Sequence, residues 1–106
     1  MAKVVYIEHG GAEHVVDVPL GNTLMEGAIW NRVPGMAAAC GGAGGCATCQ
    51  VIVEDVWLDR IIKPSSNERR TLRFAYEPGA NSRLGCQIVM TEALDGLVLR
   101  LPKRQY

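Results

Sequence analysis

The segment AAACGGAGGCATCQ, residues 37–50, decides the fold of this chain. It carries three of the four cysteines, Cys40, Cys46 and Cys49, in the spacing C-x5-C-x2-C, and every residue between them is small. Glycine reaches backbone conformations with positive φ that a tight loop requires, and small side chains let backbone N–H groups approach sulfur. The segment therefore suits the binding of an anionic centre by thiolates.

The fourth cysteine, Cys86, lies far along the chain and just before an expected strand, and three interpretations of the cysteines compete. Disulfides require an oxidising compartment, which the N-terminal sequence does not suggest. Structural zinc usually takes two short cysteine pairs, or a cysteine pair and a histidine pair, whereas His9 and His14 lie far from any cysteine pair. An iron-sulfur centre with three ligands in one loop and one distant ligand explains more of the residues.

The composition indicates a globular domain. The 106 residues are 48% hydrophobic and 21% charged, which predicts one domain over residues 1–106 with a modest core, near which we expect Trp30 and Trp57. Lys plus Arg and Asp plus Glu are equal at 11 each, so we expect no nucleic-acid partner. The N-terminal apolar run is shorter than that of a signal peptide, and Pro34, with five glycines, makes residues 33–53 a poor membrane helix. We therefore expect a cytoplasmic protein without a membrane span.

Local patterns predict the order of helices and strands. Two capping boxes, Thr23 with Glu26 and Ser65 with Glu68, mark the beginnings of two helices. Short runs rich in β-branched residues, separated by Gly, Pro and Asp-Gly turns, predict the strands. Interleaved strands and helices of this kind are typical of an α+β domain. The expected helices are 23–31 and 65–75, and the expected strands are 4–8, 15–18, 50–54, 87–90 and 97–101.

These residues resemble the adrenodoxin/putidaredoxin-type 2Fe-2S ferredoxins. The similar segments are CGGAGGCATC, NER, NSRLGCQIVM, ALDG and the terminal LPKRQY. The resemblance implies a β-grasp fold with a mixed sheet and short helices, and a 2Fe-2S cluster bound by Cys40, Cys46, Cys49 and Cys86. It implies a one-electron carrier, not an enzyme, that acts as a monomer between an FAD-containing ferredoxin reductase and a cytochrome P-450 monooxygenase. Electron donation to iron-sulfur cluster assembly, and a structural-zinc binding module with no redox role, remain as alternatives.

Two departures from the family lie beside the cysteines. Gln50 stands where members often carry His, and Ala39 stands where a member has an acidic residue that is important for its monooxygenase. A titrating histidine next to the third cysteine, and an acidic contact before the first, therefore cannot be carried over to this chain.

The second helix and the C-terminus carry the expected partner residues. Arg69, Arg70 and Arg73 stand on a helix that is acidic in adrenodoxin-like members, and Arg69 and Arg73 share one helix face. We interpret them as an altered docking face, with an ordinary solvated surface as the alternative. Tyr106 corresponds to a terminal aromatic residue that contacts the monooxygenase in the family, so we expect it to contact a partner.

Overall fold

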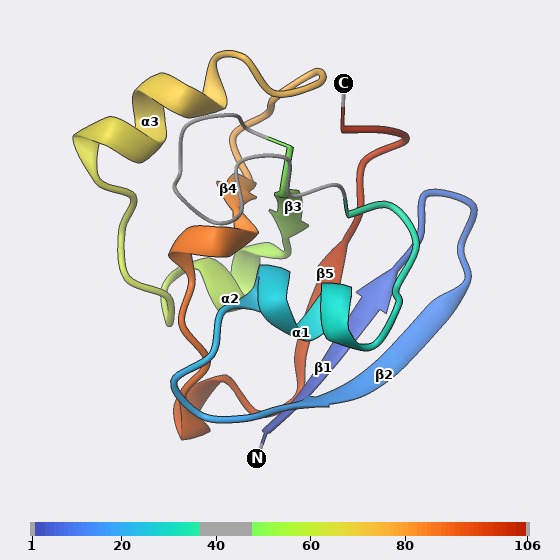
Figure 1. Cartoon of the computed structure of the whole chain (residues 1–106). Coiled ribbons are helices and arrows are strands. Elements are labelled where there is room, and N and C mark those ends of the chain that lie inside the picture. The colour runs from blue at the N-terminus through green and yellow to red at the C-terminus, as the bar shows by residue number, and fades with distance from the viewer. Residues whose placement is uncertain (1, 37–47, 106) are drawn as a thin grey trace.

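The computed structural model describes residues 2–36 and 48–105, and the strands of these residues form one mixed sheet in the order β2-β1-β5-β3-β4. β1 and β5 run parallel, whereas the other neighbouring pairs in this sheet are antiparallel. Short helices surround the sheet, and α1 crosses one of its faces (Figure 1). The expected α+β class is confirmed. The elements are β1 (Ala2–Ile7), β2 (Glu13–Val18), α1 (Leu24–Trp30), β3 (Gln50–Val53), α2 (Asp55–Leu58), α3 (Ser66–Leu72), β4 (Ser82–Leu84), η1 (Gly85–Gln87), η2 (Glu92–Leu94) and β5 (Leu97–Arg100).

The beginning of α1 is fixed to the β1–β2 hairpin. The expected capping box is present: the Glu26 N–H donates to Thr23 Oγ1 at 3.1 Å, and the Thr23 N–H donates to Glu26 Oε1 at 2.8 Å. The buried Tyr6 hydroxyl of β1 donates to the Leu24 carbonyl oxygen at 2.7 Å. Gly27 permits this close packing, because a Cβ atom there would lie 2.6 Å from a methyl carbon of β2. The cap fixes the beginning of the helix, and the Tyr6 hydroxyl and the close approach of Gly27 to Val18 hold the helix against the sheet.

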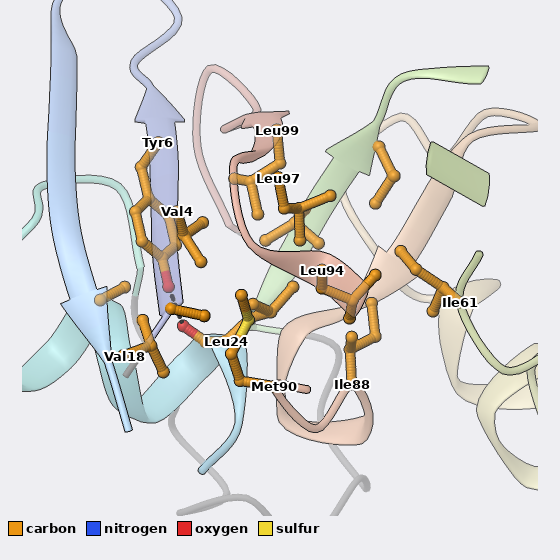
Figure 2. Packing of buried hydrophobic residues seen from close by; sticks show 14 of the residues in the cluster. Val4, Tyr6, Val18, Leu24, Ile61, Ile88, Met90, Leu94, Leu97 and Leu99 are labelled. Atoms are coloured by element: carbon orange, nitrogen blue, oxygen red, sulfur yellow. Dashed lines mark hydrogen bonds between the residues drawn. The ribbon is translucent and has the colours of Figure 1, made fainter. Parts of the chain in front are cut away.

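Buried apolar residues of the described chain form two clusters. Figure 2 shows the larger one, in which side chains of β1 and β5, such as Val4 and Leu97, meet Leu24 of α1 and the segment around Met90. The smaller cluster lies beside β3 and β4 and includes two cysteines. Cys49 and Cys86 therefore belong to the smaller of the two clusters. Its buried members are Met25, Cys49, Ala75, Leu84 and Cys86.

The expected strand at 87–90 is wrong. The strand in this part of the chain is β4, which pairs with β3 and is followed by η1, so that Cys86 follows a strand instead of preceding one. Ile88 and Met90 are buried on either side of exposed Val89, which reproduces the period of two, but Val89 forms only an isolated bridge with Thr23. The alternation of apolar residues at 87–90 correctly indicated one buried face, but this extended segment does not pair with a neighbouring strand of the described chain.

The two tryptophans differ in their environments. Trp57 of α2 packs against the larger cluster, with the Arg60 guanidinium 5.0 Å from its ring centroid, as expected for a residue near the core. Trp30 is 60% exposed, and the expectation of a core position is wrong. It lies two positions after buried Ala28, and residues two apart do not share a helix face.

No helix within the described ranges is long and apolar enough to cross a membrane.

Candidate metal centre

The pairing of β3 with β4 brings two of the predicted ligands together. Cys49 directly precedes β3 and Cys86 lies in η1, directly after β4. The antiparallel register places Gln50 opposite Leu84, and the Gly85 N–H donates to the Cys49 carbonyl oxygen at 2.8 Å. The backbone ladder therefore fixes how the two cysteine-bearing segments meet. The predicted ligands Cys40 and Cys46 lie outside the described residues.

The Cys86 sulfur lies in a setting that favours the thiolate. The pKa of the Cys86 thiol is lowered to about 6, chiefly by the hydrogen bond with the Cys49 side chain, and burial partly opposes this shift. The Gln87 side-chain amide, whose Nε2 lies 3.4 Å from the Cys86 sulfur, contributes to the same lowering. Because the thiolate is the form that binds metal, Cys86 is prepared as a ligand.

The surroundings of the two sulfurs are apolar and closely packed. Both cysteines are buried in the smaller cluster, against which Met36 and Leu72 also pack. Gly85 lies in a narrow space between the Cys49 backbone and α1, since a Cβ atom there would lie 3.1 Å from the Cys49 carbonyl oxygen and 3.3 Å from the Met25 backbone nitrogen. Two buried thiols with an amide donor nearby fit the all-cysteine ligand set of a 2Fe-2S cluster, and hydrogen bonds to sulfur are one means of tuning its potential.

A buried ion pair fixes α3 to the strand that leads into Cys86. The Arg83 guanidinium donates to both oxygens of the Glu68 carboxylate, at 2.7 and 3.1 Å, and the Leu84 N–H donates to Glu68 Oε2 at 3.1 Å. The expected Ser65 cap is present, with the Glu68 N–H donating to Ser65 Oγ at 3.1 Å. The pattern identified the beginning of the helix, but only the Ser65 half of the expected capping box is present, because the Glu68 carboxylate bonds to Arg83 and Leu84 of β4 instead of its own cap.

The predicted partner residues of α3 lie on the surface. Arg69, Arg70 and Arg73 are all exposed, which fits both a docking face and an ordinary solvated surface. The structure adds Phe74, which is 83% exposed directly after them and which the sequence analysis missed. A large apolar residue beside charged neighbours at a helix end was the available signal. Tyr106 lies outside the described residues.

Gln50 is the second residue whose role the sequence did not reveal. It is completely buried, its side-chain amide donates to the Tyr76 carbonyl oxygen at 2.9 Å, and its Oε1 accepts from the Ser82 hydroxyl at 2.6 Å. Its backbone bonds to the side chain of Gln105, which is also buried. The glutamine that replaces the family histidine thus joins the segment after α3, strand β4 and the C-terminal segment.

The chain is similar to known proteins in both sequence and structure. The family model described as "2Fe-2S iron-sulfur cluster binding domain" matches residues 7–91. Ferredoxin CarAc of Sphingomonas sp is 48% identical over 103 residues, which cover 97% of this chain and 94% of that protein. Putidaredoxin of Pseudomonas putida is 41% identical over 109 residues, which cover 100% of both chains. The crystal structure of the covalent putidaredoxin reductase-putidaredoxin complex matches at a TM-score of 0.92 with 40% identity, and covers 97% of this chain and 100% of the chain compared.

Proposed function

Because this chain belongs to the 2Fe-2S iron-sulfur cluster binding domain family, as a putidaredoxin-type ferredoxin, we propose that it carries electrons from an FAD-containing reductase to a cytochrome P-450 monooxygenase. The β-grasp fold and the 2Fe-2S cofactor expected from the resemblance are confirmed by the family match and by the similarity to putidaredoxin. The protein is accordingly an electron carrier. The observation that supports this most directly is the buried Cys49 and Cys86 pair at the β3–β4 junction.

The proposal assigns the four ligand positions to Cys40, Cys46, Cys49 and Cys86, in one domain that spans residues 1–106. The cluster supplies a reversible one-electron change of iron, and the chain supplies binding, hydrogen bonding and exclusion of water. The β3–β4 ladder holds Cys49 and Cys86, and the Gln87 amide is placed to donate to sulfur. The same proposal places the carrier in the cytoplasm as a monomer.

The partner side of the proposal concerns α3 and the C-terminus. A solved complex of putidaredoxin with its reductase supports a reductase as the electron donor. The exposed Arg69, Arg70 and Arg73 fit a partner with an acidic surface, and exposed Phe74, which follows them in the sequence, offers an apolar anchor. Tyr106 is proposed as a contact with the monooxygenase. This arrangement reverses the charge of an acidic docking helix and selects partners of complementary charge.

A rapid-mixing experiment tests the proposal. Anaerobically reduced protein is mixed under carbon monoxide with a ferric, substrate-bound P-450 from the same source, and the ferrous-carbonyl absorption is followed. We expect rapid haem reduction that slows with rising salt, and that slows about tenfold in Arg73→Glu because electrostatic steering is lost. Lys3→Glu, the same charge change at an exposed residue of β1 that pairs with Asp17, is the matched control, and we expect it to keep the original rate.

The alternatives give different results in the same preparation. Metal and sulfide analysis that finds zinc without iron contradicts the cluster and with it the whole proposal. A protein with the cluster that accepts electrons from a reductase but never reduces the haem contradicts the monooxygenase assignment and favours iron-sulfur cluster assembly. An unchanged rate of haem reduction in Arg73→Glu contradicts only the docking role of α3 and leaves the rest of the proposal standing.

A further inference from the structure

The side chain of Gln105 bonds to the backbone on both sides of the segment that carries Cys40, Cys46 and Cys49. Its Oε1 accepts from the Gln50 N–H at 2.9 Å, and its Nε2 donates to the Gln50 carbonyl oxygen at 3.0 Å. The same Nε2 donates to the Gly35 carbonyl oxygen at 2.7 Å. Gly35 precedes Cys40 in the sequence and Gln50 directly follows Cys49, so one amide bonds before the first and after the third predicted ligand.

The C-terminal segment is buried where it makes these bonds. Gln105 is only 5% exposed, although it is the last but one residue of the chain. Leu101 packs on the same glycine, because a Cβ atom at Gly35, where φ is +97°, would lie 3.2 Å from a Leu101 methyl carbon. In Figure 1 the segment after β5 runs toward the same end of the molecule as α3. The end of the chain is therefore held in place by both apolar and polar contacts.

The contacts continue from Gln50 to the other cysteine-bearing segment. The Gln50 side chain accepts from Ser82 at the beginning of β4, which leads to Cys86, and donates to the Tyr76 carbonyl oxygen after α3. The Arg104 guanidinium lies 4.9 Å from the Tyr76 ring centroid, which adds a second contact between the C-terminal segment and this region. The segment after α3, strand β4 and the C-terminal segment thus meet around the buried side chains of Gln50 and Gln105.

We infer that Gln105 is a positioning residue for the metal centre, because its amide joins Gly35 and Gln50, the residues on either side of the segment that carries three of the proposed ligands. This inference rests on the proposed ligand set. The Gln105 amide satisfies one N–H and two C=O groups of the backbone, and a substitution that removes it leaves buried polar groups without their partner. The C-terminal segment, which otherwise resembles a simple extension of the last strand, becomes part of the site.

Two substitutions separate the parts of this role. Gln105→Leu removes all three hydrogen bonds while it keeps much of the buried volume. Gln105→Glu retains an oxygen for the Gln50 N–H but loses the donor and places a carboxylate against the carbonyl oxygens of Gly35 and Gln50. Lys103→Ala, at an exposed neighbour in the same segment, is the matched control.

The experiment measures three properties of each purified holoprotein: the rate of cluster bleaching in excess chelator, the midpoint potential of the cluster, and the urea midpoint of unfolding. We expect both Gln105 variants to lose the cluster at least about tenfold faster than the original protein, because Gln105→Leu loses three buried hydrogen bonds to the backbone and Gln105→Glu loses the two that need a donor. We also expect a shifted midpoint potential, because the backbone on either side of the ligands moves, and no change in Lys103→Ala.

Each outcome decides between a positioning role and simple packing. Bleaching rate and potential that remain unchanged in Gln105→Leu overturn the inference, even if the urea midpoint falls. A Gln105→Glu variant that behaves as the original protein overturns the bond to Gly35, because that bond needs a donor. Absence of a 2Fe-2S spectrum in the original protein contradicts the proposed function itself, which separates that failure from a failure of the inference.

Discussion

The two sides of the sheet, with strands β2, β1 and β5 on one and strands β3 and β4 on the other, are stabilised in different ways. The larger cluster draws apolar side chains mainly from β1, β2 and β5, together with Val51 and Val53 of β3, and the Tyr6 hydroxyl makes a buried polar contact to α1. β3 and β4 carry the cysteines, and there the buried side chains include Glu68, Arg83, Gln50 and Ser82. Apolar packing is non-directional and sums over many contacts, whereas each buried polar group depends on a particular partner. We therefore expect the β1–β2–β5 side to keep its structure when bonds on the β3–β4 side are removed, because the β3–β4 side depends on particular partners.

This difference matches the task of each side. A metal centre needs fixed ligand positions and hydrogen-bond donors to sulfur, and directional bonds supply both. The cost is that the loss of one member weakens its neighbours, because an isolated buried charge or amide is unfavourable. Three substitutions test whether the two sides behave separately.

Cys86→Ala is expected to have the largest effect. The variant loses a proposed ligand, so the purified protein shows no 2Fe-2S absorption in the visible range, and its cluster content falls to about zero. Hydrogen exchange is the decisive measurement: amides of β1 and β5 remain protected, while those of Gln50 and Gly85 exchange faster. Thr91→Ala, at an exposed site beyond the centre, serves as the control. Equal loss of protection on both sides of the sheet contradicts the separation described here.

Glu68→Ala comes next. It leaves the Arg83 guanidinium buried without its carboxylate and removes the acceptor of the Leu84 N–H, so we expect a loss of about 3–5 kcal/mol in the free energy of unfolding. Urea unfolding followed by circular dichroism measures this loss, and faster cluster bleaching accompanies it because β4 leads to Cys86. Glu92→Ala, an exposed carboxylate, provides the comparison. A loss below about 1 kcal/mol indicates that the pair behaves as a surface ion pair.

Tyr6→Phe has the smallest expected effect. It removes one buried hydrogen bond on the apolar side and keeps the aromatic ring, so we expect a loss of about 1 kcal/mol in the free energy of unfolding. We expect the bleaching rate of the iron-sulfur cluster to remain that of the original protein, because Tyr6 lies in the larger apolar cluster and the cysteines lie in the smaller one. A variant that bleaches several times faster contradicts this independence and sharpens the role of α1, which contributes Met25 to the smaller cluster.

Local patterns in the sequence predicted the elements whose signals are local. The Thr23–Glu26 capping box, the hairpin of β1 and β2, and β5 need no information beyond a few residues, and each is present. β4 was missed because Ser82–Leu84 has neither alternation nor β-branched residues, and its three side chains are buried by contacts from distant segments. Trp30 was misplaced because a general burial tendency was applied without its helix face.

The cysteine spacing predicted the site, but the residues that organise it could not be found in this way. Glu68 and Arg83 meet across 15 positions, and Gln50 and Gln105 meet across 55. Neither pair has a local motif, and glutamine usually lies on the surface, so its burial becomes visible only in three dimensions. Long-range polar contacts are the part of this site that a local reading of the sequence leaves out.

The choice of glutamine at position 50 also has a consequence for acidity. Histidine is the side chain whose charge ordinarily changes between pH 5 and 8, whereas an amide binds no proton in that range. The bonds from Gln50 to Tyr76, Ser82 and Gln105 therefore keep the same donors and acceptors across physiological pH. A moderate fall in pH therefore leaves the charge of this side chain and its hydrogen bonds to Tyr76 and Ser82 unchanged.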